Sequence, residues 1–237
     1  MSCCRGDEDP QPRHRSEDLW SGLRHCHQQG MDRTRDRLNR LKVGTAAGRG
    51  AVRILACADL HGRPDRIARV RALVTEHTPD VVLLPGDLTH AGRGEEALDL
   101  LRSLPVPVLA VAGNMDDARA LQEIALRGGL ATPKPLTVAG ITFGGPDVQE
   151  TCDVLVTHEP PRGTLDVAFN GQHAGSERVR DMVMRFRPKV HTFGHIHESP
   201  GIVRLGATLI VNCTMGDGTT GGALIELSAA GATATML

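Results

Sequence analysis

Side chains with metal-binding atoms follow five separate apolar runs of this 237-residue sequence. In chain order these side chains are Asp59 and His61 after "RILACA", Asp87 after "VVLLPG", Asn114 after "VLAVAG", His158 after "DVLVT", and His195 and His197 after "KVHTFG". Taken singly, each would be read as a cap or a turn residue. Seven of them at equivalent places indicate a shared site. Carboxylate, amide and imidazole groups bind Mn, Fe, Zn or Ni, and the lack of thiolates argues against a softer metal.

The number of these candidate ligands favours two metal ions over one. Seven nitrogen and oxygen ligands are too many for a single tetrahedral zinc ion. They suit a pair of ions about 3.5–4 Å apart that share one carboxylate, and we expect Asp87 to be the shared ligand. Gly86, Gly113 and Gly194 each precede a candidate ligand, which predicts that the backbone there comes close to something compact.

The first half of the chain must position these residues through alternating strands and helices. The expected strands cover 51–58, 80–87 and 106–114, and the expected helices cover 63–77, 94–104 and 116–128, the last closed by Gly128-Gly129. Such alternation predicts a mainly parallel sheet with right-handed crossovers. Ligands of such sheets bind beyond the carboxyl ends of the strands, where the candidate ligands stand.

The second half is richer in expected strands. It begins with a hairpin over 136–145 that turns at Ala139-Gly140, followed by a strand over 152–158 and a long polar loop over 159–175. A helix over 176–188 with Ser176 as its N-cap, a strand over 189–195, and antiparallel strands over 201–213 and 221–237 complete the pattern.

The first fifty residues differ from the rest. Residues 1–30 have few apolar side chains and no clear period, which predicts disorder, and residues 31–43 could form one short helix with an arginine-rich face. The triplet at 25–27, His-Cys-His, is expected to be part of a solvated tail. We therefore divide the chain into an N-terminal extension, 1–50, and one domain, 51–237.

Composition limits the partners and the compartment. The net charge is −1 and aromatic residues make up 2%, so neither a basic groove nor a stacking platform for nucleic acid is indicated. No apolar run approaches the roughly 18 residues of a membrane span, and no signal peptide is evident. The six cysteines form no CxxC pair, which fits reduced thiols and a cytoplasmic location. The oligomeric state stays open.

The ordered series of motifs resembles the calcineurin-like metallophosphoesterase superfamily over about residues 52–226, in particular its small single-domain members. The series is Asp59-x-His61, Gly86-Asp87, Gly113-Asn114, His158 and Gly194-His195-x-His197, with 26 residues from His61 to Asp87 and 27 from Asp87 to Asn114. The resemblance implies an α/β fold: a four-layer αββα sandwich of two mixed sheets flanked by helices.

The same resemblance implies a dinuclear metal centre and a reaction. One ion would be held by Asp59, His61, Asp87 and His197, and the other by Asp87, Asn114, His158 and His195. A hydroxide that bridges the ions would attack phosphorus in line, which makes the chain a phosphoric ester hydrolase that uses Asp87 and Asn114 in catalysis.

One residue departs from the family pattern. Many members carry a histidine after the Gly-Asn pair that protonates or stabilises the leaving oxygen, and here that position is Met115, which has no proton to donate. Asp116, which would orient that histidine, is left without its usual role. We therefore favour phosphodiesters over monoesters, with His173 in the long loop as the candidate acid. His90 is expected to be an exposed turn residue.

Two further residues have structural interpretations, and two other classes of function are alternatives. His191, inside its strand, is expected to be a core residue, and Arg162 a solvated loop residue. The substrate would be a small phosphate ester such as a nucleotide. The alternative is a non-catalytic metal-binding scaffold, which Met115 favours mildly and the complete ligand set opposes. A Rossmann-type protein is disfavoured because the glycines at 44–50 precede the first strand.

Overall fold

The computed structural model describes residues 50–237, and the predictions for residues 1–49 lie outside the described part of the chain. The strands are β1 (Ala51–Ala56), β2 (Val81–Pro85), β3 (Val108–Val111), β4 (Leu136–Val138), β5 (Ile141–Gly144), β6 (Val154–Val156), β7 (Val190–Phe193), β8 (Gly201–Leu205), β9 (Thr208–Asn212), β10 (Ala223–Ser228) and β11 (Gly231–Met236). The helices are α2 (Pro64–His77), η1 (Glu95–Asp99, a 3₁₀-helix), α3 (Leu100–Ser103), α4 (Ala118–Arg127) and α5 (Glu177–Phe186).

The strands form two mixed sheets. The first has the order β11-β10-β1-β2-β3. In this sheet β1, β2 and β3 run parallel to one another, β10 is antiparallel to β1, and β11 is antiparallel to β10. The second has the order β4-β5-β6-β7-β9-β8, in which β5, β6, β7 and β9 are parallel and the edge strands β4 and β8 are antiparallel. The parallel arrangement predicted for the first three strands is confirmed.

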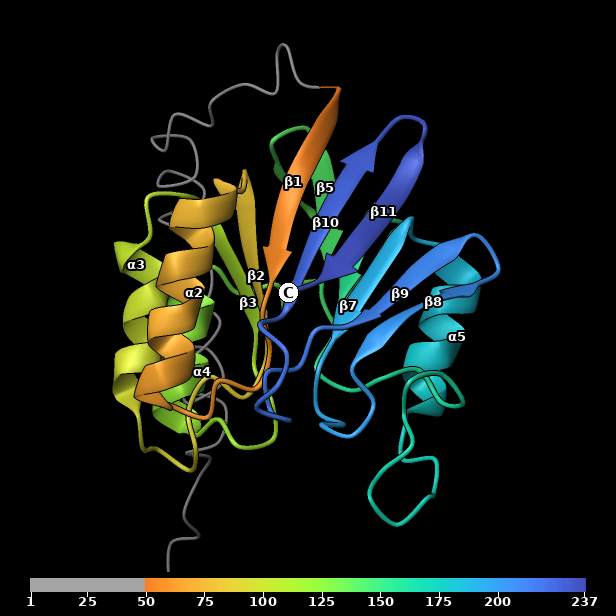
Figure 1. Cartoon of the computed structure of the whole chain (residues 1–237). Helices are drawn as coiled ribbons and strands as arrows, with labels where there is room; N and C mark the ends of the chain where they lie inside the picture. Colours follow the sequence, from red (N-terminus) through yellow and green to blue (C-terminus); the bar gives the residue numbers. More distant parts are fainter. Residues whose placement is uncertain (1–49) are drawn as a thin grey trace, which may run out of the picture.

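The two sheets pack face to face between two outer layers of helices (Figure 1). Strand residues alternate between the layers, as the two-residue period of a strand requires. In β1, Ile54 points into the core between the sheets, whereas Leu55 packs with the apolar side chains of α2, α3 and α4. In the second sheet, Val154 joins the central core and Leu155 packs with Val183 of α5. This is the predicted αββα sandwich, and burial of both strand faces explains the continuous apolar runs.

The ends of the helices follow local chemistry. Pro64 occupies the first turn of α2, where its missing N–H is no loss. The side chain of Ser176 accepts a hydrogen bond from Val179 N at the start of α5, as predicted, and Asp117 caps α4 in the same way. These caps place the helices directly after the loops that carry the candidate ligands.

One local prediction is corrected by the structure and another is confirmed. The expected helix over 94–104 begins as the 3₁₀-helix η1 after Gly94, which is in the left-handed region and provides no side-chain cap. Gly128 ends α4, as predicted, with an extended φ of −177°. A side chain there would meet Val108 O at 2.2 Å, so the glycine serves close packing of helix end against strand.

Three further observations concern the described residues as a whole. Ala139 and Gly140 both have positive φ, which confirms the predicted hairpin turn between β4 and β5. Cys57, Cys152 and Cys213 are free and buried, as expected for reduced thiols. No helix within residues 50–237 combines the length and the apolar character needed to cross a lipid bilayer.

Candidate metal centre

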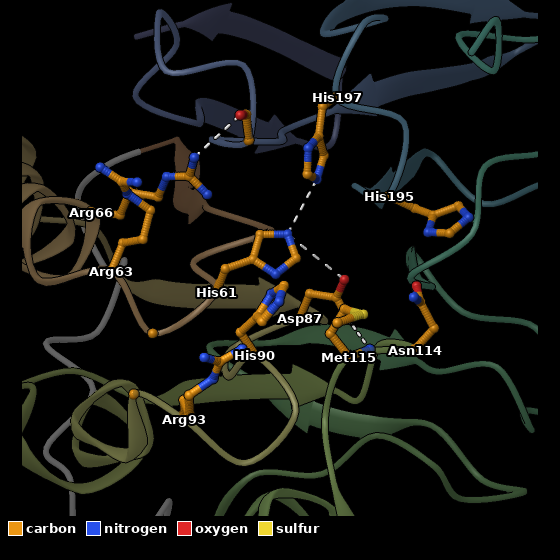
Figure 2. A pocket seen from close by; sticks show the side chains of 13 residues that line it. His61, Arg63, Arg66, Asp87, His90, Arg93, Asn114, Met115, His195 and His197 are labelled. Carbon is orange, nitrogen blue, oxygen red and sulfur yellow. Dashed lines mark hydrogen bonds and ion pairs between the residues drawn. The ribbon is translucent and has the colours of Figure 1, made fainter. Parts of the chain in front are cut away.

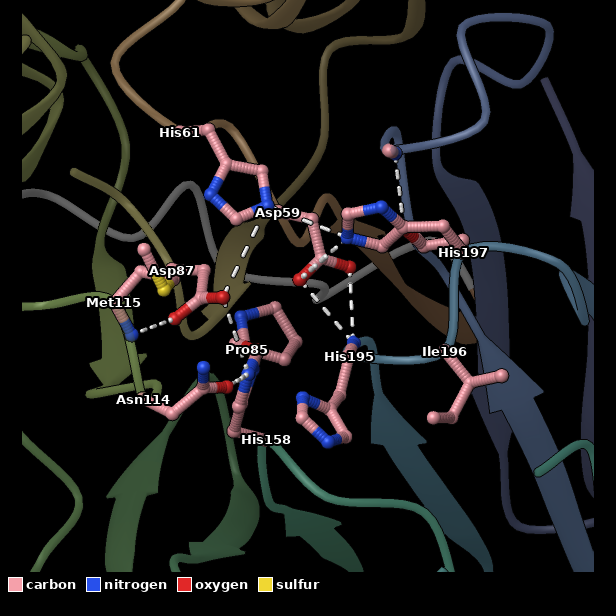
Figure 3. A network of polar contacts seen from close by, with 12 residues as sticks. Asp59, His61, Pro85, Asp87, Asn114, Met115, His158, His195, Ile196 and His197 are labelled. Carbon is pink, nitrogen blue, oxygen red and sulfur yellow. Dashed lines mark hydrogen bonds and ion pairs between the residues drawn. The ribbon is translucent and has the colours of Figure 1, made fainter. Parts of the chain in front are cut away.

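All seven candidate ligands lie at one edge of the sandwich, where the carboxyl ends of β1, β2, β3, β6 and β7 meet (Figures 1 and 3). Backbone hydrogen bonds hold the loops together: Asp59 N donates to Gly86 O, His61 N to Asp87 O, and Gly194 N to His158 O. The side chains therefore converge because the strands that carry them are neighbours, as the strand-end argument predicts.

The two aspartates are buried and lie between histidines. Asp59 is fully buried and accepts hydrogen bonds from His195 N at 3.0 and 3.2 Å. Oδ1 of Asp87 accepts one from Met115 N at 2.7 Å, while its Oδ2 lies 3.4 Å from Nε2 of His158 and 3.9 Å from Nε2 of His61. A carboxylate oxygen between two imidazoles has the position that a shared ligand requires.

Two groups of ligand atoms are compact enough to hold an ion each. One comprises Asp59, His61 and His197, the other Asp59, Asp87 and His158, with the ligand atoms of each group within 4.8 Å of one another. Oδ1 of Asn114 lies 3.0 Å from Nε2 of His158 and so belongs to the second group. Asp59 belongs to both groups and Asp87 to the second alone, so the division of ligands that the resemblance implies, with Asp87 shared, stays a prediction.

His195 contributes to this arrangement through both its backbone N–H and its ring. Its backbone N–H binds the carboxylate of Asp59, and its ring packs edge-on against that of His158, with centroids 4.9 Å apart. Neither compact group includes a nitrogen of the His195 ring. The structure thus brings His195 to the site, and its role as a ligand stays a prediction.

Lone pairs that face one another show that the site suits cations. Nδ1 of His158 donates to Pro85 O at 3.0 Å, so in the neutral ring Nε2 presents a lone pair to Asn114 and Asp87. Nε2 of His61 faces Nε2 of His197 at 3.3 Å. Acceptor atoms at such distances require a proton or a cation between them, and this donor set fits divalent ions of the Mn, Fe, Zn and Ni class.

The backbone at the ligands is strained. Asp59, His61, Asp87 and His195 have φ values of 60°, 48°, 52° and 70°, in the left-handed region that non-glycine residues avoid. Each such residue costs on the order of 1–3 kcal/mol, and residues of this kind concentrate at functional sites. The strain aims four strand-end side chains into one space.

Glycines let the ligand loops pack without intervening side chains. A Cβ on Gly86 would meet Nδ1 of His158 at 2.4 Å, one on Gly113 would meet Oδ1 of Asp87 at 2.1 Å, and one on Gly194 would meet Oδ2 of Asp59 at 2.3 Å. The prediction that these glycines approach something compact is confirmed, and the compact objects are the ligands themselves.

The pKa values of the carboxylates are set by the neighbouring imidazoles. Burial opposes ionisation of Asp59, but a hydrogen bond with His197 and the charge of His158 outweigh it and lower the pKa. Burial likewise opposes ionisation of Asp87, and its pKa is nevertheless lowered by the hydrogen bond and charge of His158 and by the N–H of Met115. Both aspartates are anions ready to bind cations.

The histidines divide into two kinds. Burial lowers the pKa of His61 and of His195, which keeps these rings neutral, as metal ligands must be. Burial also disfavours the charged form of His158, but Asp87 outweighs it and raises the pKa, while the hydrogen bond with Asp59 raises the pKa of His197. His158 and His197 therefore hold a proton more readily than a free imidazole does, because each faces a buried carboxylate.

Asp116 has a structural role that the sequence reading missed. Its buried carboxylate accepts hydrogen bonds from Leu88 N, from the N–H and hydroxyl of Thr89, and from Gly113 N, at 2.8–3.3 Å. It therefore joins the loop that carries Asp87 to the loop that carries Asn114. These hydrogen bonds form with methionine at position 115, so this role of Asp116 does not depend on a histidine there.

The remaining histidines are placed as follows. His191 is a buried core residue, as predicted, hydrogen-bonded to Thr157 and packed on Phe193, and burial lowers its pKa to about 3. His173 is half-exposed and bound to Asp166 at 2.7 Å, and it is not among the residues that line the hollow at the metal centre. Its role as the general acid therefore stays a prediction, because the structure does not place His173 in this hollow.

His90 corrects an expectation. It does lie in a turn, with its backbone paired to Arg93, but it is only partly exposed and it lines the hollow beside the metal centre (Figure 2). Its ring lies 5.4 Å from that of His61, centroid to centroid. The loop that follows Asp87 folds back over the site, so His90, although a turn residue, forms part of the wall of the hollow.

The hollow at the metal centre measures about 680 Å³ and has a second, positively charged wall. Arg63, Arg66 and Arg93 line it beside His61 and His90, across from Asn114 and His195, whereas Met115 lies next to Asp87 and Asn114 (Figure 2). No motif pointed to these arginines, because each lies in a surface loop or helix start where arginine is common. Arg162, by contrast, pairs with Glu177 in the loop, as expected of a solvated residue.

Comparisons with known proteins agree with the class that fold and ligands define. A sequence profile of the calcineurin-like phosphoesterase family matches residues 52–199. The chain therefore belongs to this family, whose members bind divalent metals and include hydrolases of phosphate esters.

Individual relatives and structures share this likeness. UPF0046 protein T07D4.2 of Caenorhabditis elegans is 48% identical over 64 residues, which cover 27% of this chain and 16% of that protein. Uncharacterized protein MJ1162 of Methanocaldococcus jannaschii is 27% identical over 195 residues, 68% of this chain and 87% of that protein. An archaeal phosphodiesterase structure superposes with a TM-score of 0.52 at 15% identity, over 78% of this chain and all (100%) of that one, which shows the shared fold.

Proposed function

We propose that this protein is a metal-dependent phosphodiesterase that hydrolyses a small phosphate diester, such as a nucleotide, at the centre formed by Asp59, Asp87, Asn114 and the four histidines. The observation that carries the proposal is the convergence of all seven side chains, with two buried carboxylates facing imidazole nitrogens at 3.4–3.9 Å. Divalent ions held there would polarise the phosphoryl group and lower the pKa of a bound water.

The shape of the site supports a diester over a monoester. A second hollow of about 270 Å³ shares Asn114 and His195 with the larger one, and its other wall is formed by Pro146, Val179 and Met182. The larger hollow borders the start of α2, the smaller one borders α5, and these helices cover opposite faces of the sandwich (Figure 1). A phosphorus atom at the centre would thus have room for a substituent on each side.

Met115 supports the same preference. It lines the larger hollow and its N–H holds Asp87, so its backbone positions the site while its thioether donates no proton. General acid catalysis contributes typically 10²–10⁴-fold, and its loss matters least for leaving groups that need no proton. The protein therefore suits substrates with stable leaving groups. We infer a cytoplasmic location from the three buried free thiols.

The test is turnover of two chromogenic esters with Mn, Ni, Fe or Zn. We expect hydrolysis of bis(p-nitrophenyl) phosphate to exceed that of p-nitrophenyl phosphate, with at least one of the metals, and both to cease when a chelator is added. A preference for the monoester would overturn the diester assignment. Stoichiometric metal without hydrolysis of either ester would favour the second candidate, a non-catalytic metal-binding scaffold, for which Met115 is the motivating observation.

A further inference from the structure

The larger hollow is lined by three arginine side chains besides the candidate metal ligands. Arg63, Arg66 and Arg93, here called the arginine wall, line it beside His61 and His90, away from Asn114 and His195 (Figure 2). Each guanidinium is permanently charged and presents a planar set of donors that matches phosphate. Three such groups in one hollow suggest an anion that the ligands themselves do not hold.

Arg66 ties the wall to the metal centre. Its Nη1 donates to the backbone oxygen of Asp59 at 2.6 Å and its Nη2 to Gly216 O at 3.1 Å, so the half-buried side chain has one position. Its positive charge lies in the same hollow as those of Arg63 and Arg93, and like charges held near one another are stabilised when an anion lies between them.

The other two arginines have donors to spare. Within residues 50–237, the side chain of Arg93 has no ion pair and no hydrogen bond. Arg63 is paired with Asp65 at 3.2 Å, but both side chains are more than half exposed, and exposed pairs of this kind contribute about 0–1 kcal/mol. A phosphate in the hollow could therefore bind Arg93 freely and compete with Asp65 for Arg63.

Close backbone packing holds the wall in place. Gly62 and Gly94 touch so closely that a Cβ on either would lie 2.2–2.4 Å from the Cα of the other. Gly62 N also donates to Leu88 O at 2.7 Å, and the turn at His90 is closed by two backbone bonds to Arg93. Because Arg63 and Arg93 are the sequence neighbours of these two glycines, the crossing places both arginines on one rim.

We propose that the arginine wall binds a second phosphate, carried by the same substrate whose ester is cleaved at the metal centre. This rests on the proposed function and narrows it: the substituent in the larger hollow bears a phosphate of its own, as in a phosphorylated nucleotide ester. The start of α2, whose N-cap Arg63 provides no side-chain cap, adds the positive end of a 14-residue helix to the same rim.

The test uses two esters that differ only in the second phosphate. They are the p-nitrophenyl ester of thymidine monophosphate, with and without a phosphate on the other sugar hydroxyl. We expect the phosphorylated ester to show a KM lower by about tenfold or more, because hydrogen bonds to charged groups contribute about 1.5–3 kcal/mol. Equal KM values for the two esters would contradict the proposal.

Variants then locate the effect. Arg93→Gln and Arg63→Gln should each bring the ratio of the two KM values close to one, and this ratio cancels any effect that the variant has on both esters alike. Arg185→Gln, on the outer face of α5, is the matched control for loss of one exposed positive charge. Arg178→Gln probes the smaller hollow. If Arg178→Gln abolishes the preference and Arg93→Gln does not, the second phosphate binds elsewhere and the proposal is wrong.

A binding measurement keeps this inference separate from the proposed function. Calorimetry with thymidine bisphosphate and thymidine monophosphate, in the presence of Mn²⁺, needs no turnover. Tighter binding of the bisphosphate by about tenfold, lost in Arg93→Gln, supports the arginine wall even if no ester is hydrolysed. Hydrolysis of bis(p-nitrophenyl) phosphate together with equal binding of the two nucleotides would uphold the phosphodiesterase and overturn the wall.

Discussion

The two sheets contribute different chemistry to the site. The first sheet carries all three oxygen ligands, Asp59, Asp87 and Asn114, and one histidine, His61. The second sheet carries only imidazoles: His158, His195 and His197. Both compact groups of ligand atoms combine the two sheets, because His197 completes one and His158 the other. Neither sheet holds such a group alone.

This difference makes the site a property of the interface between the sheets. The carboxylates of Asp59 and Asp87 are buried, and a buried charge without partners is strongly unfavourable. The second sheet supplies those partners: His195 N and His197 for Asp59, and His158 for Asp87. The strained loops of the two sheets therefore depend on each other, which the following changes would test.

The largest effect is expected when Asp87, the predicted shared ligand, is changed. Asp87→Asn keeps the shape of the side chain but removes the charge that faces His61 and His158. We expect phosphodiester turnover to fall by at least about 10³-fold, at or beyond the usual loss of one stabilising group, and bound metal to decrease. Metal analysis and turnover of bis(p-nitrophenyl) phosphate measure both. Near-normal turnover would show that Asp87 is not shared by two ions.

A second change breaks a connection within the first sheet alone. Asp116→Ala leaves Leu88 N, Thr89 N and Gly113 N without their acceptor in a buried place. We expect the free energy of unfolding to fall by about 3–4 kcal/mol, because each buried N–H left without an acceptor costs about 1–3 kcal/mol. Urea unfolding measures it, and Asp117→Ala, which removes only the α4 cap, is a control expected to cost about 1 kcal/mol. Equal losses would mean that Asp116 does not join the loops.

The second sheet can be tested through pH, using a histidine outside the metal centre. His191 is fully buried and burial lowers its pKa from 6.5 to about 3. A lowered pKa contributes stability that is present above 6.5 and is lost as the pH falls, because only the unfolded chain binds the proton readily. Between pH 6.5 and 4 we expect a loss of about 3 kcal/mol from this residue.

Unfolding by urea at several pH values compares the native protein with His191→Gln. The variant should be less stable at pH 7 but should lose less stability on acidification, so the two curves converge. Parallel curves would show that His191 does not titrate in this range. The metal ligands remain in both proteins, so their titration cancels in the comparison.

The smallest of these effects is expected at Met115. This change tests the missing general acid separately from the metal ligands. Met115→His places an imidazole in the larger hollow and keeps the backbone N–H that binds Asp87. We expect turnover of esters with poor leaving groups to rise by about tenfold, and that of p-nitrophenyl esters to change little, because only poor leaving groups need the proton. An unchanged dependence on leaving-group pKa would contradict this account of the missing acid.

Much of the fold and all seven candidate ligands could be read from local patterns. Apolar runs predicted the strands, Pro64 and Ser176 marked helix starts, and a polar residue after each run marked the edge where ligands gather. Such features depend on neighbours in sequence, so they are legible without coordinates. The helix over 94–104 was harder, because the contact between Gly62 and Gly94 that constrains its start spans 32 residues.

The residues around the ligands could not be predicted in this way. His90 had the features of an exposed turn, Asp116 had no evident role, and Arg63, Arg66 and Arg93 had those of ordinary surface residues. Their roles follow from loops that fold over the site and from glycines that touch across it. No periodicity or spacing in the chain encodes such contacts.

By itself the sequence determined the kinds of atom in the site: carboxylate and amide oxygens with one imidazole after the early strands, imidazoles alone after the later ones, and methionine where a proton donor often stands. Only the tertiary structure decided how they combine. His61 and His197 lie 136 residues apart, yet their Nε2 atoms are 3.3 Å from each other. That meeting exists because two apolar sheets bury each other's inner faces, and the hydrophobic effect that drives this packing is not directional. The order of the strands in each sheet, and the close packing of glycines at the strand ends, determine which side chains meet.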